Sequence, residues 1–197
     1  DEEELSRCRL LTLFTTWGVC SCMMERGHVL NGRDALIGEI GHMQIADCPE
    51  KLCGCGKRHC LESAVRLDHL HQLLMAEKAS WLEQEPLTFQ SLFTHSRQGD
   101  PAARKIVEYL ARCYASALHN LSLCYNQEAV VFQGDMAWAD PYFDQCLKRE
   151  LDEFRYYPEG EWLTTRYDRR ELSTLAARGD AALLRKKYFA AMSYEDD

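Results

Sequence analysis

The chain has 197 residues, a length that suits one or two domains and allows a substantial apolar core without disulfide support. Its formal net charge is −8 and it has no Lys/Arg-rich stripe, so this segment by itself is a poor candidate for binding nucleic-acid backbones. No apolar run approaches the roughly 18 residues that span a bilayer, and the acidic start is the opposite of a signal peptide. We therefore expect no membrane partner and a cytoplasmic location.

The first elements along the chain are expected to be short strands. An apolar run at residues 8–16 reads as a strand, and residues 19–24 and 28–30 follow as two more, joined by glycine-containing turns. These three segments predict a small antiparallel meander. From Gly38 to Gly56 the glycines, Pro49 and the crowded cysteines favour irregular backbone.

Helices dominate the middle of the chain. Residues 61–76 carry apolar positions at helical spacing, with a break allowed, and residues 89–98 suit a short helix. The clearest helix runs from an Asp100 cap and Pro101 to about residue 125. It is long enough to be a central element of the fold.

The last third alternates between strand and helix. Residues 129–132 are short and β-branched and predict a buried strand, and Asp140-Pro141 opens a helix through about residue 154. One more strand at 162–166 and a terminal helix at 171–191, with a break near Gly179, complete the prediction. The fold class is therefore α/β.

Ten cysteines are the anomaly in the composition, and four residues among them and beside them have metal-ligand spacing. The pattern His-x10-Cys-x-Cys-x4-Cys is formed by His42, Cys53, Cys55 and Cys60. Three thiolates and one imidazole suit tetrahedral zinc, and four protein ligands close its coordination shell, which is typical of a structural site. A reduced cysteine cluster and a disulfide are the alternatives.

Other residues have plainer expected roles. Cys48 lies near the cysteine loop and could substitute for a ligand, whereas Cys20 and Cys22, on one face of a strand, are expected to be small buried core residues. Trp17 and Trp81 could stack on a sugar ring, but packing is the expected role of both.

The cysteine loop also carries strings that resemble the ROK family of bacterial sugar kinases and sugar-responsive repressors. The strings are Gly-Glu-Ile-Gly-His-Met at 38–43, Cys-Gly-Cys-Gly at 53–56 and Cys-Leu-Glu-Ser at 60–63. The resemblance implies structural zinc on the same histidine and three cysteines. It also implies that Glu39, His42 and Glu62 bind sugar hydroxyls. A carboxylate accepts two hydrogen bonds in a fixed fork, and a metal-held imidazole presents its second nitrogen in a fixed direction.

The resemblance further implies a two-lobed, actin-like and ribonuclease-H-like ATPase fold. Residues 1–197 then look like the C-terminal lobe, with an inserted zinc-binding loop at about 38–62. The N-terminal lobe with its first phosphate loop and catalytic aspartate, and any helix-turn-helix domain, are absent from this sequence. No catalytic residue is expected within it.

Two segments depart from the kinase pattern. Where kinases of the family carry Gly-Thr-Gly in a second phosphate loop, this chain reads Thr-Thr-Trp-Gly at 15–18. Phosphate cradles need glycine so that backbone N–H groups can approach the oxygens. After the strand at 129–132 only Gly134 remains of a glycine run, and beside it Gln133 and Asp135 could still contact a ligand, although turn stabilisation is the usual role of such an aspartate.

The leading hypothesis is thus the non-catalytic, sugar-sensing lobe of a ROK-type transcriptional regulator. Its effector would be a monosaccharide or sugar phosphate, it would form a dimer, and it would reach DNA only through a missing N-terminal domain. The alternative is the C-terminal lobe of an ATP-dependent hexose or N-acetylhexosamine kinase, which would need ATP and Mg²⁺. A structural zinc scaffold without a ligand is the third class considered.

Overall fold

The computed structural model describes residues 7–34, 36–46, 51–154, 163–171, 173–179 and 181. Within them, five strands form one mixed sheet in the order β3-β2-β1-β4-β5. The strands are β1 (Arg9–Thr15), β2 (Val19–Glu25), β3 (His28–Val29), β4 (Ala129–Gly134) and β5 (Thr164–Asp168). β1, β2 and β3 pair antiparallel, whereas β4 pairs parallel to both β1 and β5. The predicted meander and the predicted α/β class are confirmed.

β5 differs from its prediction by two residues. It runs from Thr164 to Asp168, and Trp162, where the strand was expected to begin, lies outside the described residues. Its register is set by parallel pairing with β4, in which Phe132 lies opposite Tyr167 and the two rings stack at 5.4 Å. Pairing with a distant strand is not encoded in local sequence preferences, which explains the shift.

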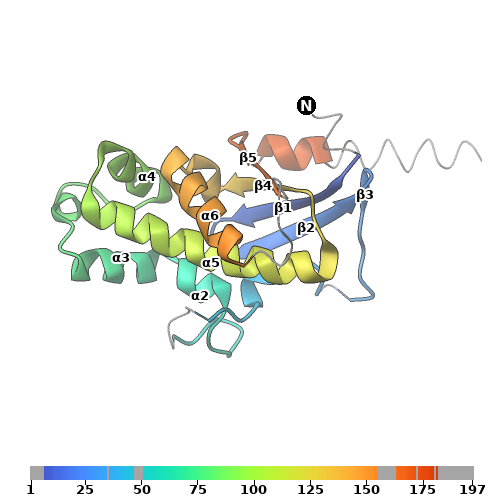
Figure 1. Ribbon diagram of the computed structural model, residues 1–197, viewed down its shortest axis with the longest axis horizontal. Coiled ribbons are helices and arrows are strands. Elements are labelled where there is room, and N and C mark those ends of the chain that lie inside the picture. The colour runs from blue at the N-terminus through green and yellow to red at the C-terminus, as the bar shows by residue number, and fades with distance from the viewer. Residues whose placement is uncertain are drawn as a thin grey trace, which may run out of the picture.

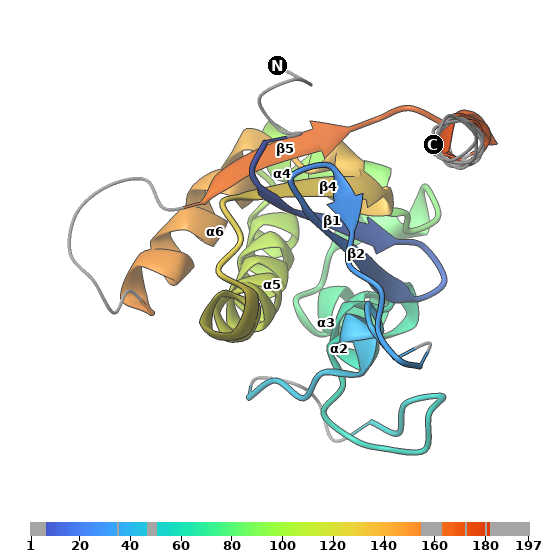
Figure 2. The same ribbon diagram turned by 90° about the vertical axis from the view of Figure 1, so that its right-hand side faces the viewer.

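The helices are α2 (Leu61–Val65), α3 (Leu67–Ala76), α4 (Phe89–Gln98), α5 (Pro101–Tyr125) and α6 (Pro141–Glu153), with short 3-10 turns η1 (Ile40–His42), η2 (Ser80–Glu83) and η3 (Asp135–Trp138). They gather on one face of the sheet, where α5 crosses the strands and α6 packs beside it (Figures 1 and 2). Residues 173–179 are helical, while the rest of the helix predicted to residue 191 lies almost wholly outside the described residues.

The predicted break between residues 61 and 76 falls at Arg66. This residue is extended, with ψ of 140°, and separates α2 from α3. The two short helices therefore point in different directions, so that α2 can lie against the cysteine loop while α3 continues along α5 (Figure 2).

Aromatic packing joins the sheet to the helices. The fully buried ring of Tyr114 on α5 meets Phe132 of β4 and Phe143 of α6 edge to face, at 5.7 Å and 6.2 Å. Its hydroxyl lies 2.8 Å from Oγ1 of Thr15 at the end of β1. The core thus reaches the carboxyl ends of the central strands, where ligands bind in open α/β sheets.

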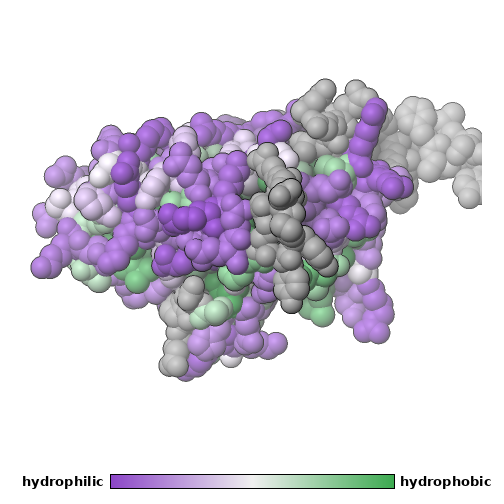
Figure 3. Space-filling model, in the orientation of Figure 1, coloured by the Kyte–Doolittle hydropathy of each residue, from purple (hydrophilic) through white to green (hydrophobic). Residues whose placement is uncertain are grey.

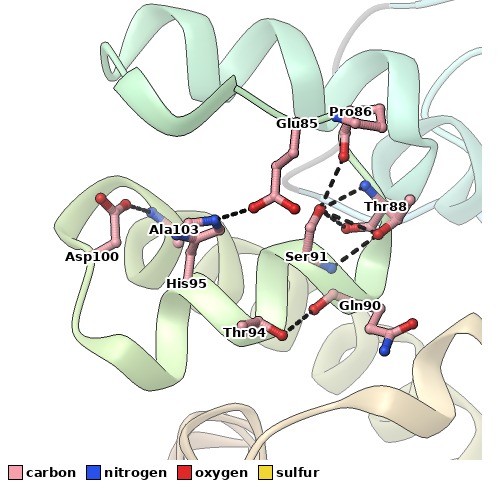
Figure 4. A network of polar contacts seen from close by, with 9 residues as sticks. All are labelled: Glu85, Pro86, Thr88, Gln90, Ser91, Thr94, His95, Asp100 and Ala103. Atoms are coloured by element: carbon pink, nitrogen blue, oxygen red, sulfur yellow. Dashed lines mark hydrogen bonds and ion pairs between the residues drawn. The ribbon is translucent and has the colours of Figure 1, made fainter. Parts of the chain in front are cut away.

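Caps define the starts of α4 and α5, and a side-chain contact ties α4 to the turn before it (Figure 4). Thr88 and Ser91 form a reciprocal capping box at the start of α4. Asp100 accepts a hydrogen bond from the backbone N–H of Ala103 at 2.8 Å and begins α5, as predicted. His95 ties α4 back to the preceding turn through Glu85, with Nε2 and Oε1 2.5 Å apart.

The surface agrees with the composition. Hydrophilic side chains dominate the face of the molecule drawn in Figure 3. In the described part of the chain, no helix combines the length and the apolar character that crossing a bilayer requires.

Candidate metal and ligand site

The structure brings the four predicted metal ligands together. The side-chain donor atoms of His42, Cys53, Cys55 and Cys60 all lie within 4.8 Å of one another. Cys53 Sγ is 3.6 Å from His42 Nδ1, and Cys55 Sγ is 3.7 Å from Cys60 Sγ. Three stretches of the loop therefore converge on one point.

Backbone hydrogen bonds explain this convergence. A bridge between Gln44 and Cys60 is flanked by hydrogen bonds from Ile45 N to His59 O and from Leu61 N to Met43 O. This short pairing brings the segment that follows η1 against the start of α2. Between them, Cys53 N donates to the carbonyl of Lys57 at 2.8 Å, which folds the Cys-Gly-Cys segment into a tight turn.

The donor set and its spacing fit zinc. With Zn–S bonds of about 2.3 Å and Zn–N bonds of about 2.0 Å, a tetrahedral site places its ligands about 3.5–3.8 Å apart. The separations of 3.6 Å and 3.7 Å match those edges. A disulfide would require sulfurs about 2.05 Å apart, and the cysteines in the described residues are free thiols. Cys48 lies outside those residues.

The thiols of Cys55 and Cys60 differ in their environments. A hydrogen bond from the backbone of Lys57 lowers the pKa of the exposed Cys55 thiol. Burial, followed by the contact with Cys55, raises the pKa of Cys60 to about 12 when no metal is bound. Since thiolates are the zinc-binding form, metal binding must release a proton from Cys60.

The predicted sugar ligands lie beside the metal cluster. His42 directs Nδ1 to Cys53, while its Nε2 faces the carboxylate of Glu39 at 3.8 Å. The Glu39 and His42 side chains remain 50% and 37% exposed, so both can reach a ligand. They line an open, largely apolar pocket of about 840 Å³ together with Met23, Ile40, Met43 and residues of the neighbouring loops.

Glu62 stands on the other side of the cluster, in the first turn of α2. Its Oε1 lies 3.8 Å from Cys53 Sγ, and its Oε2 accepts a hydrogen bond from the backbone N–H of Val19 at 3.3 Å. A Cβ on Gly18 would lie only 2.6 Å from that Oε2. Glycine at this position therefore allows the β1–β2 loop to contact the carboxylate.

A second pocket opens beyond that loop, at the carboxyl ends of β1 and β4. It has a volume of about 260 Å³ and is lined by Thr16, Trp17, Leu67 and Asp135. Gly134 has φ of +69°, and a Cβ there would lie 2.2 Å from the carbonyl oxygen of Thr15, so only glycine lets β4 end this close to β1. Burial raises the pKa of the half-buried Asp135.

Two expectations for individual side chains are wrong. Trp81 is buried as expected, but Trp17 is 97% exposed and so is no packing residue of the core. Cys20 is exposed and Cys22 only half-buried, because their cross-strand partners Phe14 and Thr12 alternate along β1 with the buried Leu11 and Leu13. The sequence signal for Trp17 was its position in a three-residue loop, where no neighbour of the strand pattern can cover it.

Asp135 lies in the first turn of η3. Within the described part of the chain, no residue donates a hydrogen bond to its carboxylate. Gln133, in contrast, donates to Asp168 of β5 at 3.4 Å.

Comparisons with known proteins give the family. The family model described as "ROK family" matches residues 7–187. Curated relatives include the N-acetylmannosamine kinases of Yersinia pestis (strain Pestoides F) and Yersinia pseudotuberculosis (serotype O:1b). Each is 30% identical over 130 residues, which are 66% of this chain and 42% of the relative. The match thus covers less than half of those relatives.

Solved structures show the same fold. A ROK hexokinase from Thermus thermophilus aligns with a TM-score of 0.63 and 25% identity, over 80% of this chain and 51% of the other. A ROK family transcriptional regulator, described as a homologue of the E. coli MLC protein, aligns with a TM-score of 0.66 and 22% identity, over 83% and 42%. A Streptomyces griseus glucokinase, solved with glucose and AMPPNP, aligns at 0.64 and 17% identity, over 82% and 56%.

Proposed function

The chain belongs to the ROK family, and from that premise we propose that it is the sugar-sensing, zinc-containing C-terminal lobe of a ROK-type transcriptional regulator. Zinc on His42, Cys53, Cys55 and Cys60 would hold the loop in shape and supply no chemistry beyond that. The sugar would bind to Glu39, His42 and Glu62.

The hydrogen bonds of the loop between β1 and β2 favour the sensor hypothesis over the kinase hypothesis. Its Thr16 N–H donates to the carbonyl of Gly18 at 3.0 Å, and the following Val19 N–H donates to Glu62. Both donors are thus used inside the protein, whereas a phosphate-binding loop keeps its N–H groups for the phosphate oxygens. Trp17 stands between them in place of a small residue. This arrangement supports a lobe that binds sugar without transferring phosphate.

Sugar recognition would proceed through oriented polar groups. Zinc on Nδ1 of His42 fixes the ring so that Nε2 faces the ligand beside Glu39. Glu62 is held by Val19, so that its carboxylate can accept adjacent hydroxyls in a fixed direction. A sugar that binds one arrangement of the two lobes more tightly would shift the regulator between states, because only differential affinity moves such an equilibrium.

The kinase relatives favour a second candidate, in which this lobe completes an ATP-dependent sugar kinase. Their curated name is N-acetylmannosamine kinase, and the catalytic base would then lie in the other lobe of the protein. DNA contact under the first candidate would depend on a segment other than this chain, and the second candidate would need ATP with Mg²⁺. A homodimer is proposed for either.

The test combines binding and turnover. Calorimetry with a panel of hexoses and N-acetylhexosamines should show binding that Glu62→Gln weakens by about tenfold or more, with zinc content unchanged. Glu153→Gln, at the exposed end of α6, is the matched control and should bind like the wild type. A coupled assay with the same sugars and ATP should show no turnover.

Either of two results would count against the proposal. Sugar-dependent ATP turnover would replace the sensor reading with the kinase reading. Unchanged sugar affinity in Glu62→Gln would remove Glu62 from the ligand set.

A further inference from the structure

An exposed tryptophan stands at the edge of the proposed sugar site. The Trp17 indole is 97% exposed in the three-residue loop between β1 and β2, while Trp81 is buried. Tryptophan is usually largely buried, so the exposure of this indole sets it apart from Trp81. The loop itself is ordered by the hydrogen bonds of Thr16 and Val19, so the indole is presented from a fixed backbone.

The pocket under Trp17 adjoins Glu62. A Cβ on Gly18, the next residue, would lie 2.6 Å from the Glu62 carboxylate. Leu67, which lines the pocket, begins α3 one residue after the end of α2. Glu39 and His42 line the larger pocket, whereas Trp17 and Asp135 line the smaller one. The Glu62 carboxylate accepts a hydrogen bond from Val19, at the end of the loop that carries Trp17. A ligand held by Glu62 would therefore lie next to the smaller pocket.

The lining of this pocket selects the chemistry of its occupant. Its side chains are an indole, an aliphatic chain, a hydroxyl and the carboxylate of Asp135, with no cation among them. A phosphate would meet a like charge there, which is unfavourable in a partly desolvated site. The carboxylate of Asp135 has no hydrogen-bond donor among the described residues, so it can accept a hydroxyl of a ligand. The indole face can pack on the C–H groups of a neutral ring. Both contacts suit a sugar ring.

The volume of the pocket also favours a single sugar ring. Pockets for drug-sized ligands usually measure about 300–1,000 Å³, so about 260 Å³ suits a fragment of one ring. We propose that this pocket is a second sugar subsite, and that the protein's ligand is a neutral disaccharide or longer oligosaccharide whose adjacent ring stacks on Trp17 and donates a hydroxyl to Asp135. This inference rests on the proposed sugar-binding function and changes its ligand from a monosaccharide or sugar phosphate to an oligosaccharide.

The experiment compares matched sugars on the protein and its variants. Calorimetry would use glucose, N-acetylglucosamine, glucose 6-phosphate, maltose, cellobiose, sucrose and N,N′-diacetylchitobiose. At least one disaccharide should bind about tenfold or more tightly than its constituent monosaccharide. Trp17→Ala should remove that advantage and change monosaccharide affinity less than about twofold, and Asp135→Asn should weaken the disaccharide several-fold.

Trp138 supplies the matched control. It lies in η3, next to the same edge of the sheet, is 40% exposed and has the guanidinium of Arg169 over its ring at 5.2 Å. Trp138→Ala should leave both affinities unchanged. In a Trp81→Phe, Trp138→Phe, Trp162→Phe background, where Trp17 is the sole tryptophan, the fluorescence should shift to the blue with the disaccharide and stay unchanged with the monosaccharide. This measurement does not depend on the folding of Trp17→Ala.

The outcomes of this experiment distinguish failure of the second subsite from failure of the proposed sugar-sensing function. If no sugar binds and zinc is present, the proposed function fails and the inference with it. If monosaccharides bind, but disaccharides bind no more tightly and Trp17→Ala alters nothing, the second subsite is wrong and the sensor stands. Tighter binding of glucose 6-phosphate than of glucose, lost in Trp17→Ala, would make the pocket a phosphate site and overturn the inference.

Discussion

At the scale of single residues, His42 connects the two parts of the candidate site. Its Nδ1 faces Cys53 in the cysteine cluster and its Nε2 faces Glu39 at the pocket. Under the proposed function, metal and ligand would act on opposite sides of one ring, so that loss of the metal should also loosen the ligand contacts.

Removal of one thiolate tests that connection. Cys55→Ser should reduce zinc from about one per chain to near zero, because three remaining donors leave the tetrahedral shell incomplete. Metal analysis measures the loss, and faster hydrogen exchange in residues 51–62 should accompany it. Cys124→Ser, exposed on α5, is the control and should keep its zinc. Full metal content in Cys55→Ser would contradict the ligand set.

Gly18 offers a way to disturb Glu62 without touching the metal. In Gly18→Ala the new Cβ would come within 2.6 Å of Oε2, and because a side-chain end can move aside, the fold should persist while the carboxylate is displaced. We expect sugar affinity to fall about tenfold, or about 1.4 kcal/mol, with zinc retained.

The control for Gly18→Ala is Gly54→Ala. Nothing lies within 4 Å of the Cβ that this change adds, so both zinc and sugar binding should be preserved. Equal sugar affinities in the two variants would show that the contact between Gly18 and Glu62 does not position the carboxylate.

At the scale of elements, α5 is the support against which the site is built. It contacts α2, α3, α4 and α6 and begins at a cap, Asp100, followed by Pro101. Since α2 carries Glu62 and follows the last cysteine ligand directly, the position of the site depends on how firmly α5 is held.

Loss of the Asp100 cap should therefore destabilise the whole lobe. Asp100→Ala removes the acceptor of the Ala103 N–H and should reduce the free energy of unfolding by about 0.5–2 kcal/mol. Urea denaturation measures the change. Gln90→Ala, exposed on α4, should stay within about 0.5 kcal/mol of the wild type, and a similar cost in both variants would argue against the cap.

At the scale of the whole molecule, one buried tyrosine links stability to alkaline pH. Burial raises the pKa of Tyr114 well above its ordinary value of 10.0, although its contact with Thr15 opposes the shift. Above pH 10 the unfolded chain loses this proton while the folded chain keeps it. The unfolded state is thereby favoured, and stability falls as pH rises.

Denaturant titrations between pH 7 and 11 should reveal this dependence. Each pH unit above 10 should cost about 1.4 kcal/mol from Tyr114 alone, until its folded pKa is reached. Tyr114→Phe should make the alkaline slope shallower, at the cost of about 0.5–1.5 kcal/mol at pH 7 for the lost contact with Thr15. An unchanged slope would mean that another group governs the alkaline transition.

Local patterns predicted most of the fold. The bounds of α4 and α5 agree with the prediction, because caps and apolar spacing are properties of adjacent residues. The actin-like α/β class expected from the resemblance is confirmed by the sheet and its structural relatives. The position of β5 depends on pairing with a strand more than thirty residues away, and local patterns predict its start two residues too early.

The candidate site also has a part that the sequence predicted and a part that it did not. Sequence spacing alone predicted a metal site at His42, Cys53, Cys55 and Cys60, and the structure places their donor atoms together. The neighbourhood of Trp17, Leu67 and Asp135 could not be foreseen, because these residues belong to three separate elements that meet only when β1 and β4 pair.

That pairing has a consequence for synthesis of the protein. β1 is a central strand, yet its parallel partner lies 119 positions later, as in the pair Leu10 and Ala129. At about 5–20 residues per second, a ribosome needs about 6–24 s to make the intervening chain. During that time β1 has β2 on one edge only, and its other edge is open to strands of neighbouring nascent chains. Slowing translation between residues 30 and 129 should therefore increase aggregation during expression, and chaperone binding to the N-terminal hairpin should reduce it.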